Sequence, residues 1–421
     1  LNEKCYWLQN FTLQIISDRV KKYEMHIASI IEELKYMEHF EDTSGLLEKS
    51  YALLNAAADT GHILKVYDAL VEARSLFEGY REQTKKNVVS LIGHAHIDMN
   101  WFWSMEETRD IVKRDFTTMT NLMEKYPDFR FSQSQAATYE IAEEDCPEVF
   151  AKMQKYEQEG RWDITASSWV EGDLNMAHGE AIVRHVLYSK EYLKKHFEKL
   201  PEIMWCPDTF GHPGTIPQIL KKTGLNRYYH MRCGLGVGSR ADSGYPDEWA
   251  YLRDSKHPPV YWWVGLDGSR VLVVNSQYNR DLDTRGILRA SLRMKDFGID
   301  NAMVTYGTGD HGGGPTERDI QWVHVMQEFP TTPAIQFCTT DAYYSYIEAG
   351  DYPLLPVRYG EMNFVFDGCY TTHADIKRQN RLCEAGLISV EKLCTIAAQH
   401  GIEYPYDELR KYWKKTLFNQ F

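Results

Sequence analysis

One segment indicates the architecture of this chain most directly: Val88-Val89-Ser90-Leu91-Ile92-Gly93-His94-Ala95-His96-Ile97-Asp98-Met99-Asn100-Trp101. Its first half is a short, β-branched and apolar run, which predicts a buried strand. Its second half places two imidazoles, a carboxylate and a large aromatic ring where that strand should end. Because side chains alternate along an extended chain, His94, His96 and Asp98 are expected on the same face. Such a set is a compact half-site for zinc or a similar divalent ion.

A structural interpretation of the same segment competes with the metal site. Three-residue patterns recur by chance, and two histidines at a strand end often only hydrogen-bond their neighbours. The metal hypothesis therefore depends on what other segments of the chain bring to the same place.

Composition limits the classes of function. The 421 residues suggest two or three domains, and a net charge of −13 argues against a nucleic-acid partner. No run of eighteen apolar residues is present, so we expect no membrane contact. The chain opens without an initiator Met, so we expect that its upstream end has been removed. It also opens without a basic, apolar leader, so we expect no signal peptide. Eight scattered cysteines without a Cys-x-x-Cys pair favour reduced thiols and a cytoplasmic location.

The periodicity of apolar residues divides the chain into regions. Residues 1–85 carry apolar residues at steps of three and four, which predicts a helical module and offers a contact for a homo-oligomer. From residue 87, predicted strands alternate with predicted helices, which indicates a parallel sheet with helices outside it, either open or closed into a barrel. The predicted strands are 87–93, 128–133, 162–168, 202–206, 227–231 and 302–306. The predicted helices are 105–125, 146–158, 179–198, 214–223 and 315–328. Residues 258–275 predict an inserted β-hairpin, and helices return from about 370.

Polar groups follow several of these strands. The segments are Trp169–Asp173, Trp205–Pro213 and Tyr306–Pro315. In parallel α/β folds the reactive groups gather at the carboxyl ends of strands, so these segments should meet the first one. Asp208 and Asp310 each have a turn interpretation, in which the carboxylate bonds local amides. Two carboxylates beside a metal would instead suit the paired nucleophile and acid/base of glycoside hydrolysis.

The ensemble of these segments resembles glycoside hydrolase family 38, the retaining, zinc-dependent α-mannosidases. The resemblance rests on Gly93–Asp98 with Trp101, on Trp169-Val-Glu171, on Trp205–His212, on Gly309–Pro315 and on Gly360–Thr372. It runs from about residue 88 to the end and favours the bacterial and cytosolic branch. It implies a (β/α)7-type, barrel-like catalytic domain over 86–345. Residues 346–421 are then a helical, three-helix-bundle-like middle domain, expected to be cut before a C-terminal β-sandwich region.

The resemblance assigns the reactive groups residue by residue. His96 and Asp98 fall on the two zinc ligands of the first strand, which leaves His94 as a neighbouring support. Asp208 falls on the residue that is both zinc ligand and catalytic nucleophile. Asp310 falls on the general acid/base. The resemblance thus implies one zinc ion per chain and an α-mannoside substrate, and a His/Asp set also accepts cobalt or manganese.

The same resemblance implies the residues that contact the substrate. Trp101 and Phe210 match aromatic residues near the zinc, and Trp101 is expected to form a floor for the sugar ring. Glu171 and Asp173 lie in a segment that lines the substrate groove. His311 is expected at the groove as well, where it can share the acid/base role of its neighbour.

A fourth zinc ligand of the family, a histidine in a His-Asp pair, follows residues much like Leu417–Phe421, where this sequence ends. We therefore expect the chain as given to bind metal weakly and to turn over poorly. Two other functions stay open. The pair His94 and His96 also suits an amidohydrolase, whose further ligands would come from His212, His230 or His311. A non-catalytic carbohydrate-binding barrel is the third alternative.

Overall fold

The computed structural model describes residues 23–99, 101–232, 259–278, 281–309, 311–353, 355–363 and 367–421. The chain divides into two compact units. The first contains the described residues up to Ser90 together with Leu282–Val304 and Arg318–Gln336. The second contains Leu91–Asp281, Thr305–Glu317 and Phe337–Phe421, and it carries all the described candidate site residues.

The first unit is mainly helical, as the apolar periodicity predicted for its N-terminal part. Residues 23–37 are helical, and α2 (Ser44–Ala58), α3 (Ile63–Ser75), η1 (Glu78–Tyr80) and α4 (Arg81–Lys85) follow. Two helices join from later in the sequence, α11 (Thr284–Lys295) and α12 (Glu317–Gln327). The core contains the stripe of residues 23–37 and its partners, among them Ile30, Leu34, Met37, Leu70, Phe77 and Leu288. Residues 13–20, where the apolar periodicity also predicts a helix, lie outside the described residues.

One five-stranded sheet begins with the segment that the sequence singled out. Its order is β10-β1-β2-β3, with β9 also paired to β1. The strands are β1 (Val88–His94), β2 (Phe131–Gln133), β3 (Trp162–Ile164), β9 (Asn301–Tyr306) and β10 (Ala334–Phe337). β1, β2 and β3 are parallel, and Gly93 of β1 lies opposite Phe131 of β2. Strands β1, β9 and β10 each begin in the first unit and end in the second.

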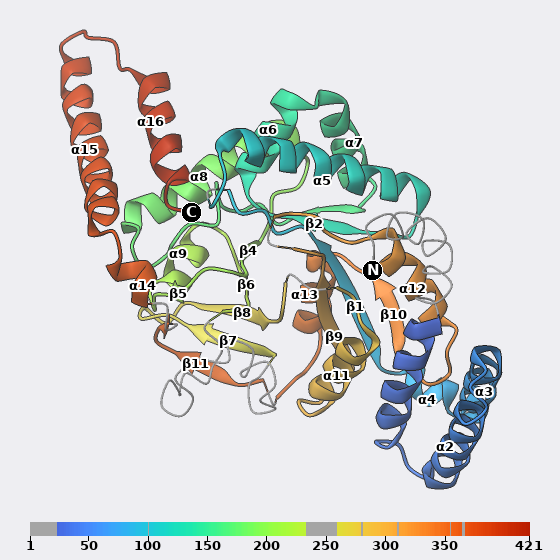
Figure 1. Ribbon diagram of the computed structural model, residues 1–421. Helices are drawn as coiled ribbons and strands as arrows, with labels where there is room; N and C mark the ends of the chain where they lie inside the picture. Colours follow the sequence, from blue (N-terminus) through green and yellow to red (C-terminus); the bar gives the residue numbers. More distant parts are fainter. Residues whose placement is uncertain are drawn as a thin grey trace. The chain divides into compact units, whose positions relative to one another are not determined.

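A second five-stranded sheet has the order β11-β7-β8-β6-β4 (Figure 1). The strands are β4 (Ile203–Cys206), β6 (Arg227–His230), β7 (Val260–Val264), β8 (Arg270–Asn275) and β11 (Val357–Tyr359). β4, β6 and β8 are parallel, so Cys206, His230 and Asn275 form one row across the sheet. β7 and β8 pair antiparallel, which confirms the hairpin expected over 258–275. β5 (Gly211–His212) and β12 (Met362–Asn363) form a separate antiparallel pair.

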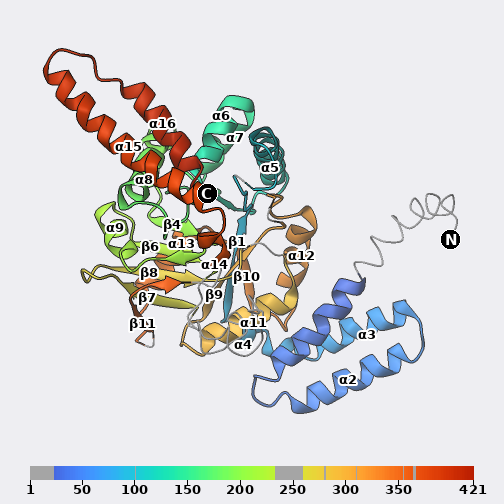
Figure 2. The same ribbon diagram turned by 60° about the vertical axis from the view of Figure 1, so that its left-hand side comes forward.

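Helices separate most of the parallel strands. They are α5 (Met105–Lys125), α6 (Ala136–Asp145), α7 (Pro147–Gln158), α8 (Gly179–His196), α9 (Ile216–Lys222) and α13 (Thr340–Ala349). α5 begins and ends where the sequence predicted. Ser104 caps its start, because the Ser104 side chain accepts a hydrogen bond from the Glu107 amide. α14 (Asp367–Thr371), α15 (Ala374–Gln399) and α16 (Tyr406–Phe418) end the chain, and α15 and α16 lie side by side in both views (Figures 1 and 2).

The predicted α/β class with parallel strands is confirmed, and the site depends on that class. Within the described residues the parallel strands belong to two hydrogen-bonded sheets, not to one closed ring of hydrogen-bonded strands. Apolar side chains fill the space between the second sheet and α9, including Ile216, Leu220, Val271 and Val273. The helices of the described residues include none that is both long and apolar enough to cross a membrane.

Gly307 fixes the approach of the loop after β9 to the end of β1. Its φ is +155°, and a Cβ atom built there would lie 1.8 Å from the His94 carbonyl oxygen. Because this contact involves backbone, it cannot be relieved by turning a side chain. The backbone of Gly307 therefore reaches a position that no larger residue can occupy beside the candidate site.

We predict that Gly307→Ala lowers the free energy of unfolding by about 3 kcal/mol or more, because of the collision and the unfavourable φ. Gly386→Ala is the matched control, since Gly386 lies inside α15 with nothing within 4 Å of the added Cβ. The control should be neutral or stabilising by about 0.5–1 kcal/mol. Urea unfolding of the two variants and the wild type measures both effects. Equal stability of Gly307→Ala and the wild type would contradict the packing described here.

Candidate active site

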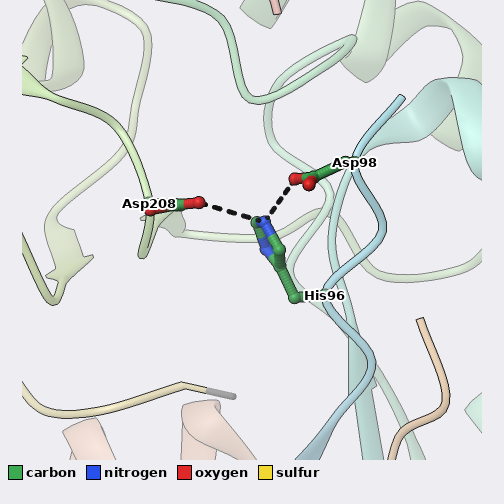
Figure 3. Close-up of side chains that lie close together, drawn as sticks. All are labelled: His96, Asp98 and Asp208. Carbon is green, nitrogen blue, oxygen red and sulfur yellow. Dashed lines mark hydrogen bonds and ion pairs between the residues drawn. The ribbon is translucent and has the colours of Figure 1, made fainter. Parts of the chain in front are cut away.

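Three predicted ligands meet at the carboxyl ends of two strands. His96 and Asp98 follow β1, and Asp208 follows β4 (Figure 3). Their ligand atoms all lie within 4.8 Å of one another. The structure thus brings together residues that are more than a hundred positions apart in the sequence. Within the described residues, this is the one cluster of three or more His, Cys, Asp or Glu side chains with that spacing.

The spacing of the three side chains suits a small divalent ion. Nε2 of His96 lies 3.0 Å from Oδ1 of Asp98 and 3.7 Å from Oδ2 of Asp208. Two ligands bound tetrahedrally to one zinc at about 2.1 Å lie about 3.4 Å apart. The observed distances lie on either side of this value. One imidazole nitrogen and two carboxylate oxygens are also donors that zinc, cobalt and manganese accept, so the residues fit the expected metal.

His94, which the resemblance left as a neighbouring support, has a hydrogen-bond partner at each ring nitrogen. Its Nδ1 lies 3.0 Å from the Ser132 carbonyl oxygen, and its Nε2 accepts a hydrogen bond of 3.3 Å from Nε1 of Trp205. The carbonyl requires a proton on Nδ1, and the indole requires a lone pair on Nε2, so the ring is neutral. Burial lowers the pKa of His94 to about 3. Both nitrogens are thus engaged, which leaves neither for a metal.

The electrostatics around His96 favour a positive charge. The ring is buried, which by itself would lower its pKa. The hydrogen bond that His96 donates to Asp98 and the charges of Glu171, Asp98 and Asp208 outweigh burial and raise the pKa of His96 to about 9. Burial and the charge of Asp208 raise the pKa of Glu171 to about 7, against the opposing effect of His96. Three carboxylates around one imidazole thus form a site whose mutual repulsion a cation relieves.

Asp208 lies between the metal candidates and a cation that the sequence did not single out. Oδ2 faces His96, and Oδ1 accepts a hydrogen bond from Nε of Arg232. Arg232 follows β6, as Asp208 follows β4, and its guanidinium also lies 5.2 Å from the Phe210 ring centroid. Arg232 thus lies just after a strand, where reactive groups gather in parallel α/β folds, and this position is the signal that points to it in the sequence.

Gln135 connects the ends of β1 and β3 beneath the site. Its Nε2 donates to the Ile97 carbonyl at 2.7 Å, and its Oε1 accepts from the Glu171 amide at 3.0 Å. Its φ of +65° is a conformation that non-glycine residues rarely adopt. This contact could not be predicted from the sequence, because it depends on an unusual backbone conformation of Gln135 and on backbone groups of two distant segments.

A groove of about 550 Å³ opens beside the three predicted ligands. Asp98 and Asp208 line it together with four predicted substrate contacts, which are Trp101, Glu171, Asp173 and Phe210. Trp101 is 46% exposed, so part of this residue is accessible from the groove. Asp173 instead uses Oδ1 to accept hydrogen bonds from the amides of Asn175 and Met176, at 2.8 and 2.6 Å.

The C-terminal helices supply another wall of the same groove. Lys377 and Asn380 of α15 line it, as do residues 419–421 after α16. The Asp173 amide donates to the Gln420 carbonyl at 2.7 Å, which fixes the end of the chain against the groove. The sequence could not reveal this wall, because helical periodicity does not show which distant segment a helix packs against.

The loop after β9 approaches the predicted ligands. His311 forms an antiparallel bridge with Ile97, and the Gly312 amide donates to the His96 carbonyl at 2.7 Å. The His311 ring lies 5.6 Å from the Trp101 ring. Asp310, the predicted general acid/base, lies outside the described residues.

The two other histidines that an amidohydrolase would recruit have different partners. Nδ1 of His212 lies 2.6 Å from the Tyr228 hydroxyl, and Nε2 of His230 lies 2.6 Å from the Tyr261 hydroxyl. Both rings are fully buried, and neither belongs to the cluster around His96. The described residues therefore bring a carboxylate-rich set together, not the histidine-rich set of the alternative.

Comparison with known families shows the family of this chain. Residues 86–368 match the family model described as "Glycosyl hydrolases family 38 N-terminal domain". The chain belongs to glycosyl hydrolase family 38. Residues 365–421 match a second model, "Alpha mannosidase middle domain".

Two curated relatives show how much of a family member this chain represents. Alpha-mannosidase G of Dictyostelium discoideum is 31% identical over 354 residues, which are 83% of this chain and 31% of the relative. Human alpha-mannosidase 2C1 is 31% identical over 82% of this chain and 32% of its own length. The chain thus spans about a third of these relatives. The fold is similar to that of an alpha-mannosidase from Enterococcus faecalis V583, with a TM-score of 0.65 and 19% identity over 79% of this chain and 38% of that one.

His185 makes the stability of the second unit depend on pH. This residue of α8 is buried. Its carbonyl oxygen accepts a hydrogen bond of 3.0 Å from the Trp169 amide, and its Nε2 lies 3.1 Å from Oε1 of Gln420. Burial lowers the pKa of His185 to about 4, against the smaller opposing effect of the Gln420 hydrogen bond. The folded chain therefore keeps a neutral ring at pH values where the unfolded chain binds a proton.

We predict that stability falls as the pH drops from about 6.5 toward 4, because the unfolded state binds more protons there. The free energy of unfolding of the wild type should fall between pH 7 and pH 5. In His185→Gln this fall should be smaller by roughly 1–2 kcal/mol. Urea unfolding at both pH values, in the presence of a chelator, measures the difference. The exposed His400, replaced by Gln, serves as the control. An unchanged pH dependence in His185→Gln would contradict the prediction.

Proposed function

We propose that this chain supplies the catalytic metal centre of a retaining α-mannosidase that hydrolyses terminal α-D-mannosides. The observation that carries the proposal is the convergence of His96, Asp98 and Asp208 beside an open groove. Family membership supports the reaction class, and the carboxylate-rich ligand set supports a glycosidase over an amidohydrolase. We include in this proposal the (β/α)7-type arrangement of the parallel strands, with a helical module over 1–85, the catalytic region over 86–345 and a helical domain from 346.

Zinc is the metal that we propose for the site. His96 would offer Nε2, while Asp98 and Asp208 would each offer one carboxylate oxygen. When bound, the ion would act as a Lewis acid toward sugar hydroxyl groups and favour distortion of the ring. His94 would keep its neutral tautomer through Ser132 and Trp205 and pack beside the ligand set.

Asp208 is the proposed nucleophile. Its two oxygens have different neighbours, because Oδ2 faces His96 and Oδ1 faces Arg232. Oδ1 would attack the anomeric carbon, and the Arg232 guanidinium would orient the carboxylate for this attack. We assign protonation of the departing oxygen, and later deprotonation of the attacking water, to Asp310 through the family resemblance.

The aromatic side chains give the groove a surface for a sugar. The exposed ring of Trp101 and the ring of Phe210 lie on the groove wall, next to the polar Asp98 and Asp208. A pyranose offers an apolar face to such rings and hydroxyl groups to the polar side chains. The combination supports a monosaccharide unit bound directly at the proposed nucleophile.

We predict that the protein carrying this chain hydrolyses an aryl α-mannoside, that a chelator abolishes the activity and that zinc restores it. Asp208→Ala should lower kcat/KM by more than about 10³-fold, because the nucleophile is lost. Asp267→Asn is the control, since Asp267 lies in the exposed β7–β8 turn and accepts hydrogen bonds from Ser269 there. The first sugar product, followed by NMR, should keep the α configuration.

Three outcomes would contradict the proposal. Undiminished hydrolysis by Asp208→Ala would remove the nucleophile assignment. Cleavage of a cyclic or N-acyl amide, without cleavage of the mannoside, would favour the amidohydrolase. Binding of mannose without hydrolysis by the wild type, at equal affinity in Asp208→Ala, would favour a carbohydrate-binding protein.

A further inference from the structure

Glu171 contacts both sides of the proposed metal centre. It follows β3, its side chain is 2% exposed, and it was expected only to line the groove. Its Oε1 accepts hydrogen bonds from the Asp208 amide at 2.6 Å, the Thr209 amide at 2.9 Å and the Thr209 hydroxyl at 3.1 Å. One carboxylate oxygen therefore fixes the backbone that carries the proposed nucleophile.

The other oxygen of Glu171 faces the histidine. Oε2 lies 3.7 Å from Nδ1 of His96, and both atoms are buried without a hydrogen-bond partner in the described part of the chain. The opposite ring nitrogen, Nε2, faces Asp98 and Asp208. A small rotation of either side chain would therefore convert the 3.7 Å approach into a hydrogen bond from Nδ1–H to Oε2.

Each ring nitrogen of His96 faces a carboxylate, because Asp98 lies 3.0 Å from Nε2 and Glu171 lies 3.7 Å from Nδ1. A cation bound at Nε2 would require the lone pair there, and the proton of the ring would then lie on Nδ1 beside Glu171. A histidine that ligates a metal generally donates its other N–H to a carboxylate or a carbonyl, and this contact raises the affinity of the site. Glu171 meets this condition while it also holds Asp208.

We propose that Glu171 is a positioning residue, which orients His96 so that Nε2 faces one metal ion and fixes the backbone from which the Asp208 carboxylate reaches the same ion. The inference rests on the proposed function, and it assigns Glu171 to the metal centre where the sequence suggested a substrate contact. A neutral amide cannot reproduce both contacts. If the Gln oxygen accepted from the two backbone amides, its NH2 group would face Nδ1–H, and two donors would oppose each other.

Asp163 offers a matched control. Its Oδ2 also accepts three hydrogen bonds, from the Ser132 hydroxyl at 2.8 Å and from the Thr340 amide and hydroxyl, each at 2.7 Å. It lies on β3, and it lines a different cavity from the groove that contains Glu171. Asp163→Asn therefore changes the charge of a comparably bonded carboxylate without touching the metal candidates.

The test measures metal binding, not only activity. Wild type, Glu171→Gln and Asp163→Asn are stripped with a chelator, checked for folding by thermal unfolding, and titrated with zinc against a chromogenic chelator. We expect Glu171→Gln to weaken zinc binding by about 10- to 100-fold, and Asp163→Asn to leave it within about 3-fold of the wild type. Visible spectra of the Co²⁺-loaded proteins should change in Glu171→Gln and match the wild type in Asp163→Asn.

The possible results separate this inference from the proposed function. Zinc binding by Glu171→Gln equal to that of the wild type, or an equal loss in Asp163→Asn, would overturn the positioning role and leave the proposed function intact. No zinc binding by the wild type would overturn both. If Glu171→Gln fails to fold, Glu171→Ala with the same titration provides the second variant, and a wild-type zinc affinity there would likewise overturn the role.

Discussion

One buried imidazole shares its surroundings with three carboxylates, and this electrostatic constraint organises the second unit. Asp98, Asp208 and Glu171 each place a carboxylate oxygen within 3.7 Å of a His96 nitrogen. Like charges this close repel one another in a buried environment, unless a cation compensates them. His96 and Arg232 provide part of this compensation in the bare chain, and the same carboxylates are ligands that a divalent ion accepts.

Strand ends and a few backbone contacts hold these side chains close together. His96 and Asp98 follow the carboxyl end of β1, Asp208 follows that of β4, and the three side chains converge there. Gln135 joins the ends of β1 and β3 in a rarely populated conformation, and Gly307 lets the loop after β9 reach the His94 carbonyl. Strain of this kind persists where the surrounding structure fixes it, and here it surrounds the proposed reactive groups.

Much of this arrangement could be predicted from the sequence, because local patterns determine it. The apolar run before His94 predicted β1, and helical periodicity predicted α5 with its bounds. His96, Asp98 and Asp208 were recognisable because each follows an apolar strand. The general rule that strand ends meet at one edge then predicts that the three residues lie together.

Other features could not be predicted, because they depend on contacts between distant segments. The first unit recruits Leu282–Val304 and Arg318–Gln336, and the groove recruits α15 and the residues after α16. The dual contact of Glu171 depends on which way each oxygen of one carboxylate faces. α6 is not among the predicted helices, although its Ala and Glu residues favour a helix.

The central claim is that His96, Asp98 and Asp208 bind one ion together. Anomalous diffraction at the zinc absorption edge, from a zinc-soaked crystal, tests it most directly. The account predicts one strong peak at about 2.0–2.2 Å from Nε2 of His96 and from one oxygen each of Asp98 and Asp208. A peak elsewhere, or a structure in which Asp208 turns away from the other two residues, would contradict it.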